Sequence, residues 1–435
     1  MVKEEIAVFW FRRDLRLNDN NGLYHALKSN LKVLPIFIFD KNILDKLEDI
    51  DDARITFIYQ QIEKLKTLIQ KQNSSLLVKY GNPLEIWGNI LNDFNVKAIY
   101  TNHDYEPYAF ERDEALNAYF SKKDITFHTF KDQVIFEKSE IVKDDGNPYV
   151  VFTPYKRKWL TILNHSYIKP YPTEKYFKNF LDVKLDDLPS LKSMGFEKSN
   201  LQFPDQEFKD ILNGYGNDRD FPAKDATSRI SVHLRFGTVS IRDLVKVAQE
   251  KSSEVWLSEL IWRDFYFSIL FHFPHSATSS FRKEYDQIEW RNNEQEFKAW
   301  CDGKTGYPIV DAGMRQLNES GFMHNRIRMV VASFLTKHLL IDWRWGERYF
   351  ARKLLDYELS SNVGGWQWAS GSGVDAAPYF RIFNPYEQVK KFDKDCTYIK
   401  KWVPEYADPF HYPKPIVDHK FARERCLETY KKALK

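Results

Sequence analysis

The chain has 435 residues, of which 43% are hydrophobic and 29% charged, and its formal net charge is +3. This composition is typical of a globular protein with room for two sizeable cores, and it excludes a disordered or fibrous chain. The weak positive charge does not by itself indicate nucleic-acid binding, and no apolar run approaches membrane-spanning length. Three widely spaced cysteines form no CxxC pair, so we expect a cytoplasmic protein without a disulfide framework or membrane association.

The first third of the chain predicts strands that alternate with helices. Short apolar runs predict strands at residues 6–11, 33–39, 75–78 and 97–100. A first crossover helix begins over 20–26, and residues 53–70 carry apolar side chains at helical spacing. This alternation predicts a Rossmann-like parallel α/β domain over residues 1–131.

Residues 132–200 are rich in proline and scattered charge, which predicts a long connector. Strand signals are lost from residue 201 onward, and the clearest helical period runs from Asn325 to Leu340. We therefore predict an all-α second domain over residues 201–435.

The segment 364–385 joins a glycine pair, Trp366, Trp368 and a glycine-rich polar turn. Glycines let a backbone approach a planar ring, and indoles can pack beside such a ring or pass electrons to it. Two other glycine-rich stretches do not indicate nucleotide binding. Residues 302–306 lack the first glycine of a P-loop, and residues 371–376 lack the strand that precedes a dinucleotide fingerprint. No cluster of His, Cys and acidic residues predicts a metal site.

Three segments combine polar groups in ways that have both a structural and a functional interpretation. Glu259 and Arg263 are four residues apart and share a helix face. They could form an ion pair at the surface, or they could line the edge of a cavity. Asn325 and Met329 also share a face, although methionine at such spacing is usually a core residue. The hydroxyl cluster at 227–231 suits a helix N-cap, and it equally suits a diphosphate.

The strings FWFRRDLRLNDN (9–20), ELIWRDFY (259–266) and GGWQW (364–368) resemble signatures of the photolyase/cryptochrome family, and the resemblance covers essentially the whole chain. It implies a bound FAD in the helical domain and a chemistry driven by blue light. The implied cofactor-binding residues are Tyr215, Thr227, Ser228, Arg229, Ile230, Ser231, Glu259, Arg263, Asn325, Arg328, Asp356, Tyr357, Glu358 and Asn362.

The resemblance also implies catalytic, relay and DNA-binding residues. The catalytic set is Glu259, Trp262, Asn325 and Met329. Trp366, Trp343 and Trp300 match an electron relay that runs from the flavin to the surface. The DNA-binding set is Arg219, Glu259, Trp262, Asn325, Arg326, Trp368 and Arg381.

Asn325 and Met329 distinguish substrate classes within the family. Members that repair (6-4) photoproducts carry histidine at these places, whereas members that repair cyclobutane dimers carry Asn and Met. The resemblance therefore implies a class I-type lyase that opens cyclobutane pyrimidine dimers in UV-damaged DNA. We expect it to work as a monomer without an obligate protein partner. The alternatives are a cryptochrome-like photoreceptor and a DASH-type enzyme for single strands. The antenna pigment stays open, but Tyr108 and Ala109 replace the residues that hold folate in relatives.

Overall fold

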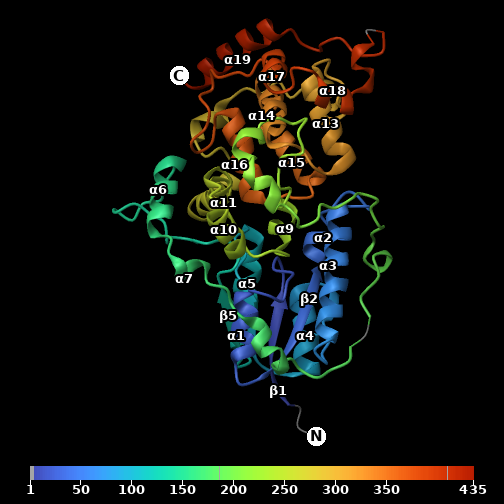
Figure 1. Cartoon of the computed structure of the whole chain (residues 1–435), viewed down its shortest axis with the longest axis vertical. Helices are drawn as coiled ribbons and strands as arrows, with labels where there is room; N and C mark the ends of the chain where they lie inside the picture. Colours follow the sequence, from blue (N-terminus) through green and yellow to red (C-terminus); the bar gives the residue numbers. More distant parts are fainter. Residues whose placement is uncertain (1–3, 186, 409) are drawn as a thin grey trace. The chain divides into compact units, whose positions relative to one another are not determined.

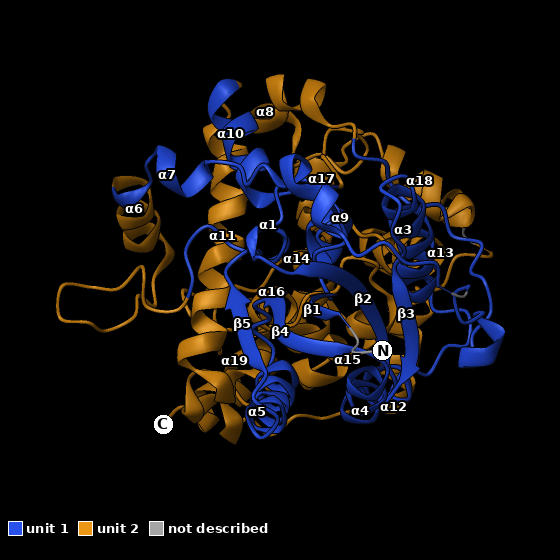
Figure 2. Ribbon diagram, turned by 90° about the horizontal axis from the view of Figure 1, so that it is seen from below, with its two compact units in different colours: residues 1–137, 162–206, 230–250 blue, residues 138–161, 207–229, 251–435 orange. Residues whose placement is uncertain are grey.

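The computed structural model describes residues 4–185, 187–408 and 410–435, which divide into two compact units. The first unit contains residues 1–137, 162–206 and 230–250, and the second contains 138–161, 207–229 and 251–435 (Figure 2). Each unit is thus built from separate stretches of chain, whereas the sequence predicts consecutive segments. Residues 132–200 are shared between the units, and residues 230–250 group with the sheet. The predicted domain boundaries stay a prediction.

A five-stranded parallel sheet forms the centre of the first unit (Figure 1). Its strand order is β3-β2-β1-β4-β5 (Figure 2). The strands are β1 (Glu5–Phe11), β2 (Lys32–Asp40), β3 (Leu77–Gly81), β4 (Asn95–Asn102) and β5 (Thr126–Phe130). In β1 and β2 every residue after the first is buried, as expected for central strands covered on both faces. Strand β5 was not predicted, because its TFHTF sequence is short and mostly exposed.

Helices cover both faces of this sheet. Figure 2 shows α1 (Asn21–Lys28) and α3 (Ala53–Gln70) on one side, and α4 (Pro83–Asp93) and α5 (Pro107–Ser121) on the other. This arrangement follows from right-handed crossovers, because the chain moves from β1 to β3 in one direction and then returns to β4 and β5. The remaining helical elements of this unit are α2 (Lys41–Leu44), α7 (His165–Ile168), η1 (Thr173–Asn179), η2 (Lys192–Met194), α9 (Ser231–Phe236) and α10 (Ile241–Glu250).

The FRRDLRLNDN string after β1 forms a buried network of charges rather than a solvated loop. Arg242 donates to Asp19 at 2.9 Å and to Asp132 at 2.8 Å, and Arg16 donates to Asp132 at 2.7 Å. Although burial opposes charge on Asp132, these two guanidinium groups hold its pKa below the usual range. The pKa of the buried Asp14 is raised by burial and by the nearby Asp132. In this unit, the string therefore holds the loop after β1 to α10.

The regular elements of the second unit, within its described residues, are helices, apart from an isolated bridge between Val142 and Pro148. Its elements in the first half are α6 (Phe152–Ile162), η3 (Lys209–Asn213), α8 (Tyr215–Asp218), α11 (Glu254–His272), η4 (Pro274–Ala277), η5 (Lys283–Gln287), α12 (Glu294–Cys301) and α13 (Pro308–Ser320). They continue with α14 (Asn325–Ser333), η6 (Phe334–His338), α15 (Trp343–Lys353), α16 (Leu359–Ser370), α17 (Pro385–Phe392), α18 (Thr397–Trp402), η7 (Pro404–Ala407) and α19 (His419–Ala433). The predicted helix over 325–340 is α14 followed by η6, a wider π-type turn. None of the helices in the described ranges is both long and apolar enough to cross a membrane.

Candidate cofactor and substrate site

The glycine pair of GGWQW lies in the middle of α16, and its two members face different surroundings. A Cβ atom on Gly364 would lie 2.3 Å from Cδ1 and Cε1 of Tyr266, so α16 and α11 pack too closely for a side chain there. A Cβ atom on Gly365 would meet nothing within 4 Å. Packing therefore requires Gly364 to be a glycine, but it gives no reason for a glycine at position 365.

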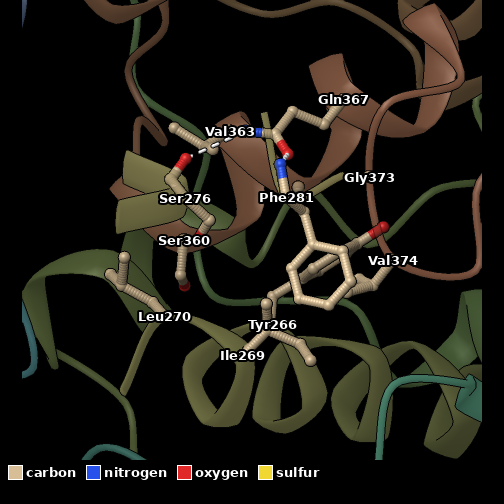
Figure 3. Close-up of a pocket in the computed structure, with 11 residues that line it drawn as sticks. Tyr266, Ile269, Leu270, Ser276, Phe281, Ser360, Val363, Gln367, Gly373 and Val374 are labelled. Atoms are coloured by element: carbon tan, nitrogen blue, oxygen red, sulfur yellow. Dashed lines mark hydrogen bonds between the residues drawn. The ribbon is translucent and has the colours of Figure 1, made fainter. Parts of the chain in front are cut away.

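Gln367 of the same motif has a structural role. Its Nε2 donates to the carbonyl groups of Ser276 and Ser279, both at 2.9 Å, and its Oε1 accepts from the backbone N–H of Phe281 at 2.9 Å. Figure 3 shows this amide beside a small cavity between α11 and α16, lined also by Tyr266 and Val363. The cavity has room for about one water molecule. It is too small for a cofactor, and the glutamine holds the loop 276–281 to α16.

One face of α16 is open around Gly365. Asn362 lies three residues before Gly365, so the two share a helix face, and the indole N–H of the buried Trp366 has no hydrogen-bond partner among the described residues. Bare backbone at Gly365 allows a flat ring to approach the helix closely. This face therefore has room for a flat ring, whereas the cavity of Figure 3 does not.

Asn362 is oriented by a neighbouring carboxyl group that the sequence did not single out. Its Nδ2 donates to the backbone carbonyl of Glu347 at 3.1 Å and to Glu347 Oε1 at 3.0 Å. Burial raises the pKa of Glu347, while the hydrogen bonds from Asn362 and Tyr357 oppose that shift. Because Nδ2 is engaged, the amide Oδ1 is left for a ligand. No sequence signal pointed to Glu347, because it lies in α15 and meets Asn362 only through helix packing.

Two other acidic residues of the predicted cofactor set have partners within the second unit. Asp356 accepts from Arg328 Nη2 at 3.0 Å, and Arg328 Nε donates to the carbonyl group of Met323 at 2.8 Å. Glu358 is the N-cap of α16, and its carboxylate accepts the backbone N–H groups of Ser360 at 3.0 Å and Ser361 at 2.8 Å. The carboxylate of Glu358 therefore stabilises the start of the helix that carries Asn362 and Gly365.

The hydroxyl cluster at 227–231 does not cap a helix with its side chains. The N-cap of α9 is Ile230, which makes no side-chain cap hydrogen bond, so the N-cap interpretation is wrong. Ser228 Oγ accepts from the indole N–H of Trp256 at 3.3 Å, and Arg229 has a left-handed backbone with a φ of 49°. Thr227 and Ser228 are half-buried in the second unit, while Ile230 and Ser231 belong to the first.

On α11 the expected ion pair forms with a different partner. Glu259 Oε1 accepts from Arg219 Nη1 at 2.5 Å, whereas Arg263 lies over the ring of Phe267. The interpretation of Glu259 and Arg263 as a surface i, i+4 pair is therefore wrong. Arg219 also lies over the ring of Tyr215, whose pKa is raised by burial to about 12. These contacts place a carboxylate and a guanidinium together, both still reachable by a ligand.

Asn325 and Met329 lie on the outer face of α14, where Asn325 is exposed and Met329 is half-buried. Met329 is therefore not a core residue. Arg326, between them in sequence, donates to Asp220 at 2.7 Å and lies 4.4 Å above the ring of Phe392. The neighbouring His324 caps α14 and accepts from the backbone N–H of Arg326 at 3.2 Å. Burial lowers the pKa of this histidine to about 4.

The predicted electron relay is only partly supported by geometry. The rings of Trp366 and Trp300 lie 6.0 Å apart, and Trp343 belongs to the same core cluster. All three are at most 2% exposed, so the expectation that Trp300 reaches the surface is wrong. It is covered because α12 packs against α13 and the indole contacts the rings of Tyr349 and Phe350 in α15. Trp290 and Trp345 pack on the same cluster and are only partly buried.

The other predicted DNA contacts lie near the C-terminal side of α16. Trp368 is half-buried at the edge of the core cluster. Arg381 is exposed and lies over the ring of Phe383, and its carbonyl group accepts from Lys337 at 2.9 Å. No group of three or more His, Cys, Asp or Glu side chains in the described parts of the chain could hold a metal ion.

Comparisons with known proteins identify the family of the chain. The family model "DNA photolyase" matches residues 7–175, and "FAD binding domain of DNA photolyase" matches residues 256–432. The deoxyribodipyrimidine photo-lyase of Synechococcus sp. is 37% identical over 467 residues, covering 97% of this chain and 96% of that protein.

Two solved structures are similar along the whole chain. The bacterial class III photolyase from Agrobacterium tumefaciens has a TM-score of 0.89 at 34% identity, with 100% of this chain and 98% of that chain covered. An archaeal photolyase from Sulfolobus tokodaii, solved with two FAD molecules, has a TM-score of 0.84 at 33% identity, with 98% and 100% covered.

Proposed function

Since the chain belongs to the DNA photolyase family, we propose that it is an FAD-dependent enzyme that splits cyclobutane pyrimidine dimers in DNA under blue light. The substrate class is inferred from the side chains on the outer face of α14. Asn325 and Met329 offer no acidic proton there, and His324 is buried, engaged as a helix cap and uncharged at neutral pH. Opening a cyclobutane ring needs no such proton, whereas repair of a (6-4) photoproduct does.

The second unit supplies the surroundings of the cofactor. When bound, reduced FAD would supply the light-driven electron that opens the cyclobutane ring. Gly365 would let the ring system approach α16, and Asn362, oriented by Glu347, would present its amide to it. Thr227 and Ser228 would donate hydroxyl hydrogen bonds to the diphosphate. The Arg328–Asp356 pair would hold α14 against the segment that precedes α16.

The substrate side combines groups for the lesion and for the DNA backbone. Glu259 would accept from the imide N–H of the damaged bases, and Trp262 would form an aromatic wall beside them. Arg219 and Arg326 now pair with Glu259 and Asp220, respectively. A DNA phosphate would compete with these carboxylates for each guanidinium group. Flipping a damaged pair out of the helix costs less than flipping a normal one, which favours lesions.

The decisive experiment offers cyclobutane dimers and (6-4) photoproducts separately to the reduced, FAD-loaded protein under blue light. We expect repair of the first lesion and none of the second. Glu259→Gln should lower the repair yield per photon more than it lowers FAD content. Repair of the (6-4) lesion would contradict the substrate class, and repair of neither lesion would favour a cryptochrome-like photoreceptor.

The oligomeric state and the antenna pigment are two further properties of the enzyme. We propose that it acts as a monomer, and that any antenna pigment is not folate. Tyr108 donates to Asp40 at 2.7 Å, and Ala109 is buried in α5, so neither offers a free polar group. Extraction of stoichiometric folate from the purified protein would contradict this. The assignment to class I stays a prediction, since one similar structure is described as class III.

A further inference from the structure

A closely stacked aromatic pair in the second unit joins α6 of the predicted connector to Trp262, the proposed substrate wall. The rings of Phe152 and Trp262 lie 3.6 Å apart between centroids, with an angle of 7° between their planes. Phe152 is 7% exposed, whereas Trp262 is only partly buried. One indole face is therefore covered by a buried ring, while part of the indole stays open.

Helix α6, which carries Phe152, is also held by two hydrogen bonds, one to the loop after α16 and one to α11. The backbone N–H of Phe152 donates to Asp375 Oδ2 at 3.2 Å, at the first residue of the helix. Trp159, two turns later, donates its indole N–H to Asp264 Oδ2 at 3.0 Å. These hydrogen bonds hold both ends of α6, so the backbone that carries Phe152 is kept in place beside Trp262.

We propose that Phe152 is a positioning residue, which holds the indole of Trp262 in the orientation that receives the damaged bases. The proposal rests on the proposed function, because it assumes that Trp262 contacts the lesion. Phe265 and Tyr266 also contact the indole, with ring centroids 5.6 and 5.5 Å away, but neither stacks on it as closely as Phe152. Without the Phe152 stack the partly exposed indole would have more freedom to change its orientation, and a substrate would have to order it on binding. A stacked aromatic partner removes that cost before the DNA arrives, so the benefit is greatest for substrates that contact the indole.

The test compares two substitutions at position 152 in the FAD-loaded protein, with binding measured to matched oligonucleotides that contain or lack a cyclobutane dimer. Phe152→Leu keeps an apolar side chain but removes the stack. It should weaken binding to the dimer about 2- to 12-fold while leaving binding to undamaged DNA unchanged. Phe152→Tyr keeps the stacking ring and should restore the affinity for the dimer.

Tyr155→Leu is the matched control, because Tyr155 projects from the same helix onto Phe265 of α11 rather than onto Trp262. It should lower the melting temperature without changing the preference for the dimer. An equal loss of dimer preference in Tyr155→Leu, or none in Phe152→Leu, would overturn the proposal.

A double-mutant cycle tests the same contact without DNA repair. In urea unfolding, Phe152→Leu should shift the midpoint less in a Trp262→Ala background than in the wild-type protein. Equal shifts in both backgrounds would overturn the positioning role. A coupled pair in a protein that repairs neither lesion would instead contradict the proposed function and leave the contact itself established.

Discussion

Replacing the two adjacent glycines of α16 by alanine should have opposite effects on stability. Within a helix, alanine is favoured over glycine by about 1 kcal/mol. Gly365→Ala should therefore stabilise the flavin-free protein by up to about 1 kcal/mol, because its Cβ meets nothing within 4 Å. Gly364→Ala should destabilise it by about 1–3 kcal/mol, because its Cβ would lie 2.3 Å from two ring atoms of Tyr266.

The affinity for FAD should not rise with stability in the Gly365→Ala variant. If the ring system lies against Gly365, the added methyl group displaces it, and the affinity for FAD should fall by about tenfold or more. Urea unfolding of the flavin-free protein and titration with FAD measure the two quantities separately. Destabilisation of the flavin-free protein by Gly365→Ala would show that its open face is filled by protein. Wild-type affinity for FAD in that variant would show that the flavin plane lies elsewhere.

Three further predictions concern electron transfer, DNA binding and pH. Trp366→Phe should severely slow the light-driven reduction of bound oxidised flavin, while repair by the chemically reduced protein persists. The rate of flavin reduction is measured under steady illumination with an external reductant. Arg326→Ala should weaken binding to DNA and reduce the slope of log K against log salt by about one unit. Arg344 pairs with Asp286 and is not among the predicted DNA contacts, so Arg344→Ala should leave that slope unchanged. Burial lowers the pKa of His338 to about 3 and that of His324 to about 4, so both stay largely uncharged in the folded protein between pH 6.5 and pH 5, where the unfolded chain binds protons. The free energy of unfolding should therefore fall by roughly 2 kcal/mol per histidine between pH 6.5 and pH 5. His338→Asn should remove one of these two contributions. If the pH dependence of stability is unchanged in that variant, the lowered pKa of His338 is contradicted.

Local patterns were sufficient where a segment's own side chains decide its structure. The uniformly apolar runs of β1 and β2 identified these strands, because a strand buried on both faces carries apolar side chains at nearly every position. The helical spacing of apolar residues identified α3, because a helix buried on one face repeats them every three or four residues. Strand β5 left no such record, because it lies at the sheet edge. The family signatures were long enough to indicate the cofactor and the reaction class without any tertiary information.

Partnerships between distant segments depended on the fold. Glu259 had a suitable cation four residues away, yet it pairs with Arg219 of another segment. Trp300 matched a surface relay position and is fully buried, and two neighbouring glycines differ because only one of them faces Tyr266. Glu347 and Phe152 carried no signal, since each matters through a residue remote in sequence. A side chain's neighbours across helices are set by how whole elements pack, and a local pattern records which face is buried but not what covers it.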